Sequence, residues 1–234
     1  EKKPLVAKYY GTGNGKTTIS NKEELDKIKE SLKGADYRIT EIKKGERTKK
    51  APLPFTTSTL QQEASKVLNF SPQKTMRLAQ QLYEGVEVKG EGTIGLITYL
   101  RTDSTRVSEE AEKMAKEYIE DRYGAEYAGE GTERKPGQKI QDAHEAIRPT
   151  AVSRIPLDIK DQLPRDLFRL YQLIWKRFTA SRMQAAKYET VSVKIGAGEQ
   201  IFTVASSKLL FDGFMSVYTP VSYTHLTLPT SDLV

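Results

Sequence analysis

The hydrophobic pattern changes its period twice along the chain, and this order limits the possible folds more than any other feature. Short strand-like runs occur near both ends, before residue 50 and after residue 188, and the later runs, on either side of Gly196-Ala197-Gly198, predict a hairpin. Between them, from about residue 53 to 183, apolar residues recur at helical spacing. We therefore predict an α+β fold in which a mostly helical domain is inserted into a β-rich, discontinuous domain.

A glycine-rich turn near the N-terminus has two interpretations. Asn14-Gly15 lies between two strand-like runs, which predicts a hairpin. Gly15-Lys16-Thr17 also has the ending of a phosphate-binding loop, but that motif needs a glycine five positions earlier, where Tyr10 stands. We therefore predict a hairpin, followed by a helix over 22–33 that Asn21 caps.

Start signals divide the central block into helices. Ser71-Pro72 predicts one N-terminus, Ser108 predicts a second helix that runs to about 123, and a third is expected over 165–183. The basic stretch 43–50, which is followed by prolines, is predicted to be a boundary. We place the domain limits at 1–52, 53–183 and 184–221; residues 222–234 lack Lys and Arg and are predicted to be a non-native tail.

Composition excludes several classes of protein. There is no cysteine and there are only two histidines, so disulfides, thiolate zinc sites and thiol nucleophiles are excluded and a His-built metal site is not expected. No window approaches eighteen consecutive apolar residues, so we expect neither a membrane span nor a signal peptide, and a cytoplasmic location. The net charge of +6 favours an anionic partner, nucleic acid first.

The most informative segment is Gly95–Thr105. A strand is predicted over 96–100, and side chains alternate along an extended backbone, so Tyr99 and Arg101 are expected on one face, together with Ile97 and Asp103 if the strand continues that far. Arg binds phosphate through two parallel hydrogen bonds, and a neighbouring cation favours the ionised form of a phenol. This pairing suits attack on a phosphodiester, although Tyr and Arg two residues apart also occur on strands for packing alone.

His144 lies in the motif Ala143–Pro149, near Arg148. A lone histidine is usually a surface or capped residue, but here it is a candidate second donor to a phosphate oxygen. The sequence contains no acidic cluster with the Asp-x-Asp spacing that holds Mg²⁺. No metal site is therefore predicted within the chain.

Four ordered motifs together resemble bacterial DNA topoisomerase I of the type IA family, over about residues 1–221. They are Pro54–Ser65, Leu82–Gly85, Ile97–Thr105 and Ala143–Pro149. The resemblance implies that the helical domain carries the nucleophile and that the β-rich segments form an arch domain.

The resemblance also implies roles for individual residues. Tyr99 is expected to attack one DNA strand and to become joined to its 5′ phosphate, Arg101 to contact the scissile phosphate and His144 to assist there. Asp103, Glu145 and Arg148 lie in the same motifs and are supporting candidates for DNA binding.

The family's N-terminal metal-binding domain is not expected within these residues. We therefore expect Mg²⁺ to bind outside this chain, the partners to be single-stranded DNA and that metal-binding domain, and the protein to be a monomer. The chain alone is not expected to relax supercoiled DNA. Two alternatives stay open: a non-catalytic module that binds single-stranded DNA, and a basic structural domain with no nucleic-acid role.

Overall fold

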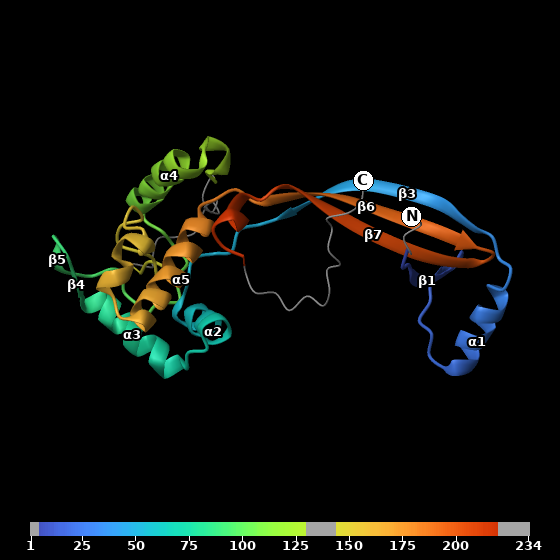
Figure 1. Ribbon diagram of the computed structural model, residues 1–234, viewed down its shortest axis with the longest axis horizontal. Helices are drawn as coiled ribbons and strands as arrows, with labels where there is room; N and C mark the ends of the chain where they lie inside the picture. Colours follow the sequence, from blue (N-terminus) through green and yellow to red (C-terminus); the bar gives the residue numbers. More distant parts are fainter. Residues whose placement is uncertain (1–4, 130–143, 220–234) are drawn as a thin grey trace. The chain divides into compact units, whose positions relative to one another are not determined.

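The structure, a computed structural model, describes residues 5–129 and 144–219. The chain divides into two compact units (Figure 1). The sheet unit comprises Glu1–Thr48 and Lys187–Phe211, and the helical unit comprises Lys49–Ala186 and Asp212–Val234. The α+β prediction is confirmed. The predicted domain limits stay a prediction, and the predicted tail, 222–234, lies outside the described residues.

The sheet unit contains one five-stranded sheet in the order β2-β1-β7-β6-β3. Helix α1 (Lys22–Ser31) connects β2 to β3 along the chain. The long strands β3, β6 and β7 run side by side in Figure 1. The strands are β1 (Lys8–Thr12), β2 (Gly15–Lys16), β3 (Tyr37–Lys49), β6 (Ala186–Ala197) and β7 (Gln200–Phe211).

The glycine-rich turn is a hairpin, as predicted. Strands β1 and β2 pair in antiparallel fashion, with Gly11 opposite Lys16. Gly11 has a φ of 144°, and a Cβ atom there would collide with the backbone of Gly15, so only glycine fits. Helix α1 begins at Lys22, not at Lys16, and the Asn21 side chain accepts a hydrogen bond from the Glu24 amide at 2.8 Å.

The second hairpin is also confirmed. Strands β6 and β7 join at a two-residue turn in which Gly198 has a φ of 61°. Most of the basic stretch 43–50, which is predicted to be a boundary, forms the second half of β3, and the division between the two units falls within it, after Thr48. Since β3 is an edge strand whose side chains are largely exposed, its lysines remain in water and do not oppose pairing.

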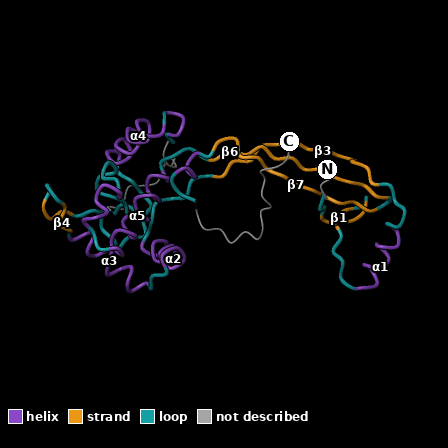
Figure 2. The backbone as a smooth tube through the Cα atoms, in the orientation of Figure 1, coloured by secondary structure: helices purple, strands orange, loops and turns teal. Residues whose placement is uncertain are grey.

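The helical unit contains the predicted helices, and Figure 2 shows them as purple segments. Ser71 Oγ accepts from the Lys74 amide, with Pro72 in the first turn, and Ser108 Oγ accepts from the Ala111 amide. The helices are α2 (Thr57–Leu68), α3 (Pro72–Glu84), α4 (Glu109–Tyr123) and α5 (Arg165–Ser181). The hairpin of β4 (Val86–Val88) and β5 (Gly92–Ile94) was not predicted from the sequence, because three-residue strands are too short to show a period.

Helix α5 supplies the centre of the core. Leu170, Tyr171 and Ile174 have no exposed surface, and α2 and α3 pack against this helix. The indole Nε1 of Trp175 donates to the Val152 carbonyl at 2.8 Å, and the Tyr171 hydroxyl donates to Arg154 in the same loop. The core therefore anchors the loop that follows the His144 motif. None of the helices in the described part of the chain has the length and apolar content that a membrane crossing requires.

Candidate active site

Three segments that lie far apart in the sequence meet at one end of α2. They are residues 55–58, 96–106 and 144–150. The amide of Ile147 donates to the Phe55 carbonyl at 2.8 Å, and the amide of Ala146 donates to the Arg106 carbonyl at 2.8 Å. The second and third segments therefore lie side by side against the start of α2.

The segment around Tyr99 does not form the predicted strand, and its backbone bends at Thr98 and Leu100. Its one β-bridge within the described residues 96–106 joins Ile97 to Pro149. Exposure nevertheless alternates from Tyr99 to Ser104, with the odd-numbered side chains exposed and the even-numbered ones buried. Tyr99, Arg101 and Asp103 thus share the exposed side, whereas Ile97 is buried with 1% of its surface exposed. Neighbouring side chains and loops hold this backbone in place of a β-ladder.

Tyr99 is accessible to a large substrate. Its side chain is 45% exposed, and its ring packs edge-on against Tyr83 of α3, with 5.5 Å between the ring centroids. The preceding residue, Thr98, fixes the position of the backbone: its Oγ1 donates to the Ala146 carbonyl at 2.7 Å and accepts from the Arg148 amide at 3.0 Å. The phenol is therefore presented at the surface from an anchored main chain.

A pocket of about 380 Å³ lies beside this segment. Arg101, Asp103 and His144 contribute to its wall, but Tyr99 does not. The structure therefore brings together three of the predicted residues and places Tyr99 two positions along the chain from the pocket. The complete lining is Thr56, Thr57, Ser58, Arg101, Thr102, Asp103 and His144.

The electrostatics of this pocket suit an anion. Thr56 is the N-cap of α2, so the positive end of the helix dipole faces this side, and no acidic residue lies in the first turn. The Arg101 side chain is exposed and adds a full positive charge, and His144 adds a nitrogen donor. Asp103 is the one carboxylate in the lining. A phosphate group bound here would meet Arg101 and the N-terminus of α2, with the His144 side chain beside them.

Glu145 and Arg148 are paired with each other outside the pocket lining. The Arg148 guanidinium donates twice to Glu145 Oε2, at 2.7 and 3.1 Å, and once to the Pro149 carbonyl. The pKa of Glu145 is lowered overall. Burial alone would raise this pKa, but the hydrogen bonds from Ser108 and the positive charge of Arg148 together have the larger effect. The pair joins the His144 loop to Ser108, the N-cap of α4. The DNA-binding role predicted for these two residues stays a prediction.

Thr56, Thr57 and Ser58 line the pocket but were not predicted as site residues from the sequence. The helix start was detectable, because Thr56 and Thr59 form a capping box. Their place beside Arg101 was not detectable, since the contacts span more than forty residues of sequence. Among residues 5–129 and 144–219, no group of three or more His, Asp or Glu side chains is arranged to hold a metal ion.

Comparison with known families matches residues 6–231 to the DNA topoisomerase family. The chain belongs to this family. Among solved structures, it is similar to full-length topoisomerase I from Thermotoga maritima, with 37% sequence identity and a TM-score of 0.74. The match covers 95% of this chain but 38% of the T. maritima topoisomerase chain. This chain therefore corresponds to less than half of that relative.

Proposed function

We propose that this chain is the tyrosine-bearing part of a type IA DNA topoisomerase that cleaves and reseals one DNA strand without ATP and relaxes negative supercoils. Family membership supports the substrate class. The single observation that carries the proposal is the common exposed side of Tyr99 and Arg101, with Arg101 also lining the anion-suited pocket. A phosphodiester seated against Arg101 is proposed to come within reach of Tyr99, which is exposed two positions earlier in the chain.

The proposed reaction is a transesterification. The Tyr99 oxygen attacks the phosphorus, a bond forms between that oxygen and the 5′ phosphate, and the bond from phosphorus to the 3′ oxygen breaks. The phenol loses one proton and the departing 3′ oxygen gains one, so charge and atoms balance. Because the phosphotyrosine bond conserves the ester's energy, the 3′ hydroxyl reseals the strand by the reverse step.

Arg101 and His144 are the proposed donors to the phosphate oxygens. Charge builds up on these oxygens in the transition state, and fixed donors there stabilise it. Asp103 lies on the same exposed side and is proposed to orient Arg101 or a DNA group. Glu145 and Arg148 are proposed to hold the His144 loop against α4, and their contribution to DNA binding is then indirect.

The proposed partners are single-stranded DNA and the remaining part of the enzyme. Mg²⁺ is proposed to bind in that remaining part, because the described residues offer no group of ligands for it. No step above is assigned to a metal. We propose that the chain alone does not relax supercoiled DNA.

The test is formation of a covalent adduct. The chain is mixed with the rest of a family member, Mg²⁺ and a labelled single-stranded oligonucleotide, and the products are separated under denaturing conditions. A labelled band at the size of this chain is expected for wild type and is expected to disappear in Tyr99→Phe. The matched control is Tyr83→Phe, which changes the neighbouring ring and should keep the adduct. An adduct that survives Tyr99→Phe contradicts the proposal.

A second candidate is a module that binds single-stranded DNA without cleaving it. One observation favours it: Tyr99 packs on Tyr83 and does not line the pocket. Stacking between aromatic rings and bases is a common way to bind single strands. This candidate predicts salt-dependent oligonucleotide binding with no adduct in the assay above, and Tyr99→Phe would then leave binding unchanged.

A further inference from the structure

One threonine side chain holds the backbone on both sides of Arg101. Thr57 Oγ1 donates to the Leu100 carbonyl at 2.8 Å and accepts from the Thr102 amide at 2.9 Å. The Thr57 amide donates to the Thr102 carbonyl at 2.9 Å. A residue in the first turn of α2 thus fixes the backbone of a segment that belongs to no strand.

These contacts are hard to replace. Leu100 and Thr102 are buried, with 1% and 7% of their surfaces exposed, so water does not readily reach their backbone groups. An unpaired buried amide or carbonyl costs about 1–3 kcal/mol, and the chain rearranges to avoid that cost. Without the Thr57 hydroxyl, the local rearrangement that satisfies these groups moves Arg101.

Thr57 also lines the pocket, but its donors are already used. The hydroxyl has one proton, which points to the Leu100 carbonyl with Thr102 as a weaker second acceptor at 3.1 Å, and the amide is donated to Thr102. Neither group is left to bind an anion. The side chain therefore acts on the site through the backbone of its neighbours.

We propose that Thr57 is a positioning residue that sets the Tyr99–Arg101 segment against the positive end of α2. This inference rests on the function proposed above. Thr98 makes the corresponding contacts on the other side of Tyr99, to Ala146 and Arg148. Two threonine hydroxyls thus bracket the nucleophile, and Thr57 fixes the side that carries the phosphate-binding guanidinium.

The test separates positioning from DNA binding. Thr57→Val keeps the β-branched shape and removes the hydroxyl, whereas Thr57→Ser keeps the hydroxyl. In the adduct assay at saturating oligonucleotide, Thr57→Val is expected to lower the cleavage rate at least about tenfold, since small misplacements of reacting groups are that costly. Oligonucleotide affinity is expected to change less than about threefold, and Thr57→Ser is expected to restore the rate to within about threefold of wild type.

A structural readout accompanies the rates. The Thr102 amide is expected to exchange its proton with solvent faster in Thr57→Val and at the wild-type rate in Thr57→Ser. The matched control is Thr93→Val in the β4–β5 hairpin, whose hydroxyl bonds to exposed Glu87. It should cleave as wild type does.

Several outcomes decide the inference. If Tyr99→Phe abolishes the adduct but Thr57→Val cleaves at the wild-type rate, the inference is wrong and the proposed function stands. If the adduct survives Tyr99→Phe, both fail. A loss that Thr57→Ser does not restore also overturns the inference, because the hydroxyl is then not the cause. If Thr57→Val does not fold, Thr57→Ala replaces it with the same predicted loss, and a wild-type rate in that variant is the contradicting result.

Discussion

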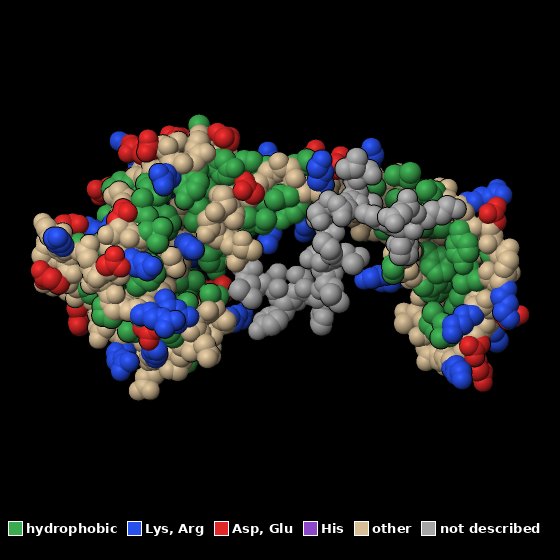
Figure 3. All heavy atoms as spheres, in the orientation of Figure 1, with side chains coloured by type: hydrophobic (Ala, Val, Ile, Leu, Met, Phe, Trp, Pro, Cys, Tyr) green, Lys and Arg blue, Asp and Glu red, His purple; other side chains and the backbone are tan. Residues whose placement is uncertain are grey.

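The two units of this chain are stabilised in different ways. The largest fully buried side chains all belong to the helical unit, among them Phe55, Tyr171, Phe178 and Phe214. In the described part of the sheet unit, only Gly11 and Ala197 are buried. The sheet unit instead leaves large apolar side chains in solvent, and Figure 3 shows hydrophobic groups on its drawn face. Side-chain packing holds the helical unit, whereas backbone pairing and turns hold the sheet.

Charge is divided in the same uneven way. The sequence of the sheet unit has fifteen Lys and Arg against ten Asp and Glu, a net +5 of the chain's total of +6. The helical unit, which carries all of the candidate site residues, is close to neutral. The attraction for an anion at the site therefore comes from local groups, Arg101 and the α2 N-terminus, and not from a net positive field of its own unit.

The largest expected effect comes from opening a cavity in the helical core. Leu60 has no exposed surface, so Leu60→Ala should lower the free energy of unfolding by about 2–5 kcal/mol. Trp175, the one tryptophan of the chain, is buried in this unit, so its fluorescence during urea unfolding reports the change. Leu210→Ala in β7 removes a side chain that is 56% exposed and should shift unfolding by less than about 0.5 kcal/mol. Equal losses in the two variants would remove the distinction between the units.

In the sheet unit the sensitive positions should be backbone positions. Gly11→Ala places a Cβ atom against the Gly15 backbone at a φ of 144°, which should cost about 2 kcal/mol and break the β1–β2 pairing. Amide exchange at Lys16 and Thr17 should then accelerate while Trp175 fluorescence stays unchanged. Gly13→Ala is the control, because a Cβ atom there meets nothing within 4 Å. Protection that persists at Thr17 in Gly11→Ala would show that the turn does not require glycine.

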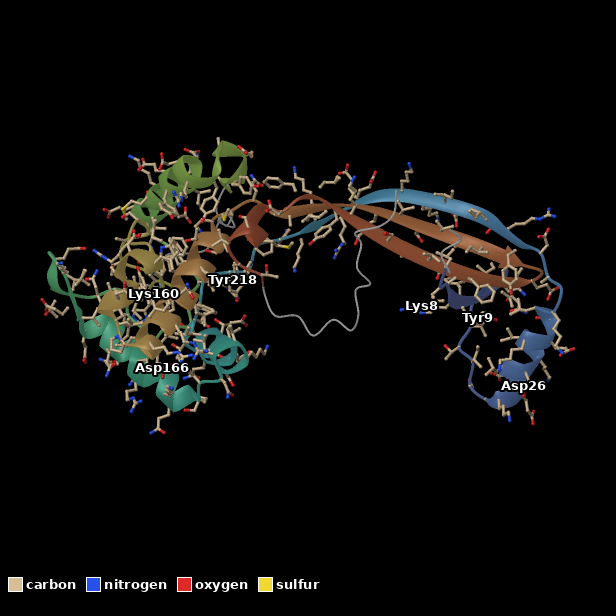
Figure 4. All side chains as sticks on the ribbon, in the orientation of Figure 1. Lys8, Tyr9, Asp26, Lys160, Asp166 and Tyr218 are labelled. Atoms are coloured by element: carbon tan, nitrogen blue, oxygen red, sulfur yellow. The ribbon has the colours of Figure 1, made fainter. Side chains whose placement is uncertain are left out.

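A smaller effect is expected from alkaline pH, again in the helical unit. Burial, together with the hydrogen bond donated to Glu63 at 2.7 Å, raises the pKa of Tyr218 to about 12 (Figure 4). Since an unfolded tyrosine titrates near pH 10, this group contributes its stability fully below pH 10 and loses it as the pH rises toward 12. The loss should be roughly 1–2 kcal/mol.

The comparison between wild type and Tyr218→Phe isolates that contribution. Burial also raises the pKa of Tyr171, so both proteins lose stability in alkali, and the wild type should lose more. The measurement is urea unfolding by Trp175 fluorescence at several pH values from 9 to 12. Parallel curves for the two proteins would mean that Tyr218 does not titrate as described.

Features of the fold that depend only on residues close together in the sequence were predictable. The caps at Asn21, Ser71 and Ser108 and both hairpins were predicted because a cap or turn is decided within a few residues. The extent of β3 was not, since its lysine-rich half is held by pairing with a distant strand. A local sequence pattern does not show which distant strand a polar segment will pair with.

The candidate site shows the same limit. The common side of Tyr99 and Arg101 was predicted from a strand, and the structure keeps the alternation of exposed and buried residues from Tyr99 to Ser104 without a strand. The burial of Ile97, the contact of Arg148 with Ser108 and the contacts of Thr57 depend on segments tens of residues away. The residues of the motifs were visible in the sequence, but the groups that hold them in place were not.

The most direct test of this account is to locate the DNA on the protein. The adduct is trapped by denaturation, digested and sequenced by mass spectrometry, so that the modified residue is identified and not only inferred from variants. The account predicts a nucleotide phosphate on the oxygen of Tyr99 and an unmodified Tyr83, which lies 5.5 Å away between ring centroids. A phosphate on Tyr83 or on any other residue of this chain would contradict it.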